Sequence, residues 1–121
     1  MPQRLVLLAE GLKGVIAAYN PTEAAIEETF VNKNAASALK LGQARGVAMV
    51  TAAQAGLDVT EYSANKIKQA VTGFGHADKN QMMAMIRLLL PLSGKLTPDA
   101  ADALAIAVCH AHHGTNMSLR A

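Results

Sequence analysis

The stretch that decides the fold is AAIEETFVNKNAASALKLGQARGVAMVTAAQAGLDVTEY, which covers residues 24–62. Its first part, 24–30, is a short run with an apolar first half, and this pattern predicts a buried strand. An asparagine before and a glycine after predict a helix over 35–55. Residues 57–62 alternate in polarity and predict a second strand. A strand, a helix and a strand of these lengths predict a right-handed parallel crossover.

Helices are expected on both sides of this unit. Residues 4–19 carry apolar side chains at helical spacing, and the Asn20-Pro21 pair ends that helix. Three more helices are expected after the second strand, over 63–71, 78–90 and 98–113, the last with Gly114 after it. Two strands are few for a sheet, so the sequence looks like part of an α/β fold whose other strands are absent. The face expected to be buried on the first helix consists of Leu5, Leu8, Leu12, Val15, Ile16 and Tyr19.

The composition limits the class of protein. The chain has 121 residues, of which 51% are hydrophobic and 17% charged, so a single globular domain over 1–121 is expected and a disordered chain is excluded. One cysteine excludes a disulfide framework and fits a reducing compartment. The apolar runs are far shorter than the roughly 20 residues of a membrane span, so a soluble cytoplasmic protein is expected. Basic residues outnumber acidic ones eight to three over 29–95, which suits either a phosphate-binding surface or solvated helix faces.

Three carboxylates are candidates for a metal site. Glu27 falls toward the carboxyl end of the first predicted strand, where ligands collect in open α/β sheets. Asp99 and Asp102 lie three residues apart in the first turn of the last helix, so they share a face. Carboxylates gathered in this way favour a hard divalent ion such as Mg²⁺. The residues alone leave a simpler interpretation open, in which Glu27 is a solvated strand end and the two aspartates complement the helix dipole.

The run CHAHH at residues 109–113 is a second, weaker metal candidate, because His113 lies one turn from Cys109 and His110. No other cluster of Cys or His occurs in the sequence, and histidines at a helix end also complement its dipole. The glycines around Phe74 do not match a phosphate-binding motif, and no serine or cysteine has the neighbours that a nucleophile needs.

Three stretches together carry a resemblance to one family. They are AIEETFVNKNAASALKLGQARGVAM (25–49), IKQAVTGFGHADKNQM (67–82) and PDAADALAIAVCHAH (98–112). In this order and spacing they closely resemble the RuvC-type Holliday junction resolvases, which cut four-way DNA junctions. The resemblance covers nearly the whole chain. It implies a ribonuclease H-like α/β fold, here a truncated form with about two parallel strands and five helices.

The resemblance also implies an activity, a site and partners. The family's activity is that of a Mg²⁺-dependent endonuclease acting in recombination and DNA repair, with two ions in the complete site and Mn²⁺ as an alternative. Its partners are four-way junction DNA, a second copy of the chain held through the small-residue helix 35–55, and a branch-migration motor complex. The catalytic, metal-binding acids correspond to Glu27, Asp99 and Asp102. The DNA-binding residues correspond to Phe30, which helps to open the junction centre, and to Lys68 and Lys79, which hold the backbone.

The sequence departs from the family's pattern in one respect. The family begins with a strand that carries an aspartate in an I-D-P-G-type motif, and no D-P-G occurs in these 121 residues. We therefore expect little or no cleavage by the chain alone, and an unpaired edge on the strand that holds Glu27. Two alternatives to the nuclease stay open: a non-cleaving junction-binding protein, and a purely dimerising fragment. We also expect Glu27 to lie within about 10 Å of Asp99 and Asp102 if they share an ion.

Overall fold

The computed structural model describes residues 1–28 and 34–120, and only the backbone beyond His113. The chain forms two compact units, Met1–Glu61 and Tyr62–Ala121. The helix and strand order predicted from the sequence is confirmed, with a short 3₁₀ helix added. The elements in chain order are α1 (Pro2–Tyr19), β1 (Glu23–Glu27), α2 (Ala35–Gln54), β2 (Asp58–Tyr62), α3 (Ala64–Thr72), α4 (Lys79–Leu89), η1 (Pro91–Ser93) and α5 (Pro98–Arg120).

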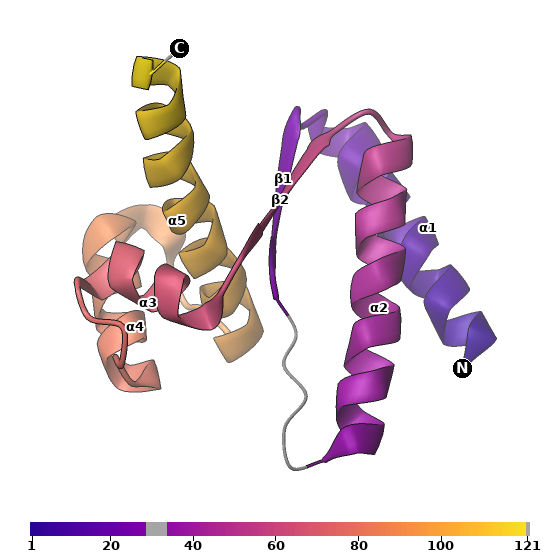
Figure 1. Cartoon of the computed structure of the whole chain (residues 1–121), viewed down its shortest axis with the longest axis horizontal. Helices are drawn as coiled ribbons and strands as arrows, with labels where there is room; N and C mark the ends of the chain where they lie inside the picture. Colours follow the sequence, from indigo (N-terminus) through magenta and orange to yellow (C-terminus); the bar gives the residue numbers. More distant parts are fainter. Residues whose placement is uncertain (29–33, 121) are drawn as a thin grey trace. The chain divides into compact units, whose positions relative to one another are not determined.

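The first unit contains α1, α2 and the sheet. Strands β1 and β2 lie side by side and run in the same direction, with α2 as the crossover between them (Figure 1). Helix α1 packs along α2. It ends where Asn20 adopts a left-handed conformation (φ 48°) before Pro21. Among the described residues the sheet has only these two strands, so β1 has a strand neighbour on one side.

Local capping accounts for where the helices begin. The side chain of Asn34 accepts a hydrogen bond from the Ser37 amide at 3.1 Å, and Ser63 accepts one from the Lys66 amide at 3.2 Å. At α4, Asp78 and Gln81 form a reciprocal capping box, in which each side chain accepts from the other's backbone amide at 2.8 Å. These contacts join residues three apart, which is why the sequence alone predicts these starting points.

The second unit is a cluster of helices with its own small core. Helix α3 packs against both α4 and α5, and α4 also contacts α5 (Figure 1). Small residues on α5 let its neighbours approach closely, because Ala101 and Ala105 are buried together with Cys109. Ile86 of α4 is completely buried. The described buried side chains of this unit are Tyr62, Ile67, Val71, Ala77, Ile86, Ala101, Ala105 and Cys109.

Three expectations need correction. The last helix does not end before Gly114 but continues to Arg120, because one glycine inside a helix costs only about 1 kcal/mol relative to alanine. On α1, no residue of the expected face is fully buried: Val15 and Tyr19 are exposed, and the other four are half-buried. The strand predicted over 24–30 is β1, Glu23–Glu27, and its central residues are half-buried rather than buried. They line an apolar hollow of about 290 Å³, together with residues of α1, α2 and β2.

Candidate functional site

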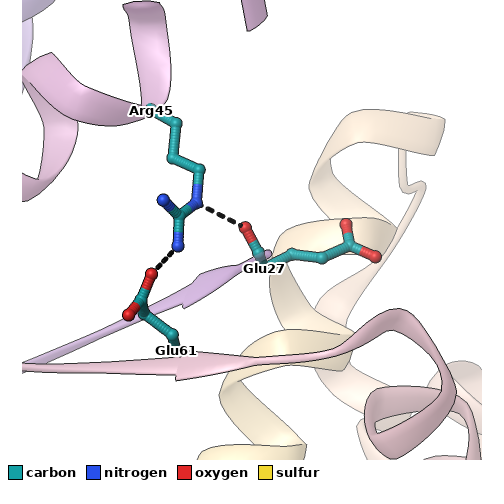
Figure 2. Close-up of polar contacts among 3 residues, drawn as sticks. All are labelled: Glu27, Arg45 and Glu61. Atoms are coloured by element: carbon teal, nitrogen blue, oxygen red, sulfur yellow. Dashed lines mark hydrogen bonds and ion pairs between the residues drawn. The ribbon is translucent and has the colours of Figure 1, made fainter. Parts of the chain in front are cut away.

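Glu27 is the last residue of β1, and its side chain is exposed. Its backbone carbonyl accepts a hydrogen bond of 3.1 Å from Nε of Arg45 on α2. The same guanidinium forms an ion pair with Glu61 of β2. Figure 2 shows the Glu27 carboxylate directed away from this guanidinium. The main chain of Glu27 is therefore bonded to α2, while the Glu27 carboxylate points away from Arg45.

Asp99 and Asp102 lie in the first turns of α5. The helix begins after Thr97, whose hydroxyl oxygen accepts a hydrogen bond from the Ala100 amide at 3.1 Å. Both aspartates are exposed, whereas Ala101 is buried against the helices of the second unit. The spacing that puts the two acids on one helix face thus also keeps both carboxylates outside the core.

The basic residues assigned by resemblance belong to the second unit. Lys68 lies on α3 and is half-buried, and Lys79 is the first residue of α4 and is exposed. Thr72 fixes the end of α3, because its hydroxyl donates to the Lys68 carbonyl at 2.8 Å. Phe30 falls outside the described residues. The roles of Lys68, Lys79 and Phe30 in DNA binding remain predictions.

The three acids suit a hard divalent ion in their chemistry, since carboxylate oxygens are the donors that Mg²⁺ prefers. Glu27 belongs to the first unit, and Asp99 and Asp102 belong to the second. Within either unit, the described residues bring no three His, Cys, Asp or Glu side chains together as a metal site. The gathering of Glu27 with the two aspartates therefore remains a prediction.

The CHAHH run places Cys109 in the core of the second unit. The thiol of Cys109 is completely buried, and its sulfur lies 3.9 Å from the Lys66 carbonyl oxygen. Burial raises the pKa of the Cys109 thiol, and the positive charge of Lys66 opposes that rise. A neutral thiol is a poor nucleophile.

Tyr62 is the residue of this region that the sequence did not single out. Its ring is buried, stacks on His113 at a centroid distance of 5.4 Å, and meets His110 edge-on at 5.7 Å. Its hydroxyl and His110 Nδ1 form a hydrogen bond of 2.6 Å. The pKa of His113 is lowered, first by burial and then by the charges of Lys66, His112 and His110. The signal in the sequence for this cluster was the spacing of His110 and His113, which places both histidines on one face of α5.

Comparison with known proteins decides the family. A family model described as "Crossover junction endodeoxyribonuclease RuvC" matches residues 1–110. The crossover junction endodeoxyribonuclease RuvC of Afipia carboxidovorans is 56% identical over 113 residues, which is 93% of this chain and 66% of the relative. The chain belongs to the RuvC family. The RuvC of Brucella suis is also 56% identical over 113 residues, covering 93% of this chain and 65% of that protein.

Solved RuvC structures share the fold. The structure described as "Thermus thermophilus RuvC structure" superposes with a TM-score of 0.82 at 35% identity, covering 93% of this chain and 69% of that one. The "T. thermophilus RuvC in complex with Holliday junction substrate" gives 0.84 at 34% identity, covering 93% and 68%. The ribonuclease H-like fold expected from the sequence is confirmed. The chain spans 65–66% of the length of the two curated RuvC relatives named above. Among the described residues, no helix is long and apolar enough to cross a membrane.

Proposed function

We propose that this chain acts on four-way DNA junctions, nicking them by metal-assisted phosphodiester hydrolysis in recombination and DNA repair. The observation that carries the proposal is the 56% identity over 93% of the chain to relatives named as crossover junction endodeoxyribonucleases. The T. thermophilus RuvC bound to a Holliday junction, which superposes over the same share of the chain, supports the substrate. A cytoplasmic setting fits the single, buried cysteine.

The candidate residues fall into three groups with different tasks in this mechanism. Glu27, Asp99 and Asp102 would hold Mg²⁺ through their carboxylates. With two ions held in the complete site, one would activate a water and the other would stabilise the leaving oxygen of an in-line displacement. Lys68 and Lys79 hold the DNA backbone and offset charge that develops on the phosphate. Phe30 stacks on a base at the junction centre, a contact worth about 1–3 kcal/mol.

We also propose that two copies of the chain act together through α2. Its alanine- and glycine-rich sequence allows close helix contact, and it carries exposed Leu39, Leu41 and Val50. A symmetric dimer would bring one site to each of two opposing strands of a junction. A branch-migration motor complex is the further partner that the resemblance implies. Sedimentation as a monomer at high micromolar concentration would count against the dimer.

Junction nicking is the experiment that tests the proposed activity. A four-way junction with one labelled arm is incubated with the chain in Mg²⁺ and, separately, in EDTA. Binding is measured beside it by gel shift at low salt, where phosphate contacts are strongest. The variants are Glu27→Gln, Asp99→Asn and Asp102→Asn, each made in the chain extended by a family strand that carries the aspartate, because little or no nicking is expected of the chain alone. Each should lower the nicking of the extended chain about 100-fold or more while binding persists. The matched control is Asp58→Asn, which neutralises an exposed acid at the start of β2.

A non-cleaving junction-binding protein is the second candidate, favoured by the absence of a D-P-G motif from the 121 residues. Nicking is therefore measured a second time on the chain extended by a family strand that carries the aspartate. Nicking restored by the aspartate strand, and not by the same strand with asparagine, supports a divided metal site. Binding without nicking in every form supports the second candidate. No binding at low salt contradicts both and leaves the dimerising fragment.

A further inference from the structure

We propose that Arg45 is the positioning residue for Glu27, holding the carboxyl end of β1 so that the glutamate side chain leaves the strand in one direction. The inference deepens the proposed function, because it rests on Glu27 being one of the metal-binding acids. Two contacts carry it. Arg45 Nε donates to the Glu27 carbonyl oxygen at 3.1 Å, and Arg45 Nη2 pairs with Glu61 Oε1 (Figure 2).

An arginine is the side chain that can make both contacts together. Its guanidinium is planar and rigid, and it presents several donors at fixed angles. One N–H of the guanidinium donates to a carbonyl oxygen of β1, and another nitrogen pairs with a carboxylate of β2. The guanidinium therefore joins both strands to the middle of α2. The Arg45 side chain is only 21% exposed, against 44% for Glu61, so water competes less for the guanidinium than it does at an open surface.

The contact to a main-chain oxygen is what makes this a positioning role. Fixing the Glu27 carbonyl fixes the peptide that joins residues 27 and 28, and with it the direction of the Glu27 Cα–Cβ bond. The Glu27 carboxylate is directed away from the guanidinium (Figure 2). The positive charge of Arg45 is neutralised by the Glu61 carboxylate. Arg45 therefore holds the main chain of Glu27 without attracting the Glu27 carboxylate to the guanidinium. Metal sites need ligands held within about 0.5 Å by such supporting bonds.

The first test measures order at the strand end by NMR of the whole labelled chain. In the native chain, the Glu28 amide should show an order parameter near the rigid value of about 0.85. Arg45→Gln removes both contacts, and Arg45→Lys keeps the charge without the planar fork; in both, the value should fall below about 0.6 and the Glu27 carbonyl carbon should shift. Glu61→Gln keeps the bond to the carbonyl and should retain most of the order. Unchanged Glu28 order and Glu27 shift in both Arg45 variants would overturn the proposal.

Two controls separate positioning from general stability and charge. Met49→Ala removes apolar packing of the same helix at the hollow beside β1, and Lys40→Gln removes a positive charge from an exposed position on that helix. Both should leave the order at Glu28 as it is in the native chain. Loss of order in Met49→Ala equal to that in Arg45→Gln would reduce Arg45 to a structural residue and contradict the proposal. Arg45→Lys provides the decision if Arg45→Gln does not fold.

A second measurement links the strand end to the metal. Mn²⁺ is titrated in, and the broadening of the Glu27 resonances is followed. Substitution of a residue that supports a metal ligand typically lowers metal affinity about 10- to 100-fold. The Mn²⁺ concentration that gives half of the broadening should therefore rise by about that factor in both Arg45 variants. The same Mn²⁺ dependence in native chain and variants would contradict the positioning role. Absence of broadening at Glu27 in the native chain would overturn the proposed metal role of Glu27, while the order measurement still decides whether Arg45 holds the strand end.

Discussion

Tyr62→Phe removes one oxygen atom from the most connected aromatic ring of the second unit. Tyr62 is 4% exposed, and its hydroxyl makes the 2.6 Å hydrogen bond to His110 Nδ1. Phenylalanine keeps the ring contacts with His110 and His113 and loses only that bond. Losing one partner of a buried hydrogen bond costs about 1–3 kcal/mol, so the free energy of opening the unit should fall by that amount.

The thiol of Cys109 provides the assay. It is completely buried, so a thiol reagent modifies it only when the unit opens, and the labelling rate follows the population of the open form. A loss of about 1–3 kcal/mol corresponds to labelling about 5- to 150-fold faster. The matched control is Tyr19→Phe, the same chemical change at a side chain that is 80% exposed, where the rate should stay within about twofold. Equal labelling rates in the two variants would refute the reasoning.

Three further predictions concern acidity, packing and salt. The pKa of His113 is lowered in the folded chain, so the unfolded chain binds this proton at a higher pH than the folded chain does. The second unit should therefore lose stability as the pH falls below about 6.5. In urea unfolding compared at pH 7.5 and 5.5, His113→Gln should weaken that loss, and an unchanged pH dependence would contradict the prediction. Ile86→Ala should lower the free energy of unfolding by about 2–5 kcal/mol, because this side chain is completely buried. Leu92→Ala, at a side chain that is 99% exposed, should lower it by less than about 0.5 kcal/mol. Similar midpoints of unfolding in the two variants would argue against the assigned core. Lys79→Gln should reduce the slope of log affinity for junction DNA against log salt concentration by about 1. Lys13→Gln, at an exposed position on α1, should leave the slope unchanged. If Lys79→Gln does not alter the slope, Lys79 does not contact the DNA backbone.

The secondary structure was predictable because its determinants are local. The caps of α2, α3 and α4 each join residues three positions apart, and the β1–α2–β2 crossover follows from element lengths and polarity. Where a competing local signal was weak, the prediction failed: Gly114 does not stop α5, since a glycine costs a helix little when its neighbours favour it. The same locality explains why Asp99 and Asp102 could be paired from spacing alone.

The sequence by itself determined the elements, their order, the family and the three candidate acids. Only the tertiary structure decided what holds those elements in place. Arg45 lies 18 positions from Glu27, and Tyr62 lies 48 positions from His110, so no periodicity connects either pair. It also decided that Cys109 is a buried packing residue, because exposure depends on which helices cover α5. Such contacts arise when separate segments pack together, and the free energy that selects them comes from burial shared by the whole unit.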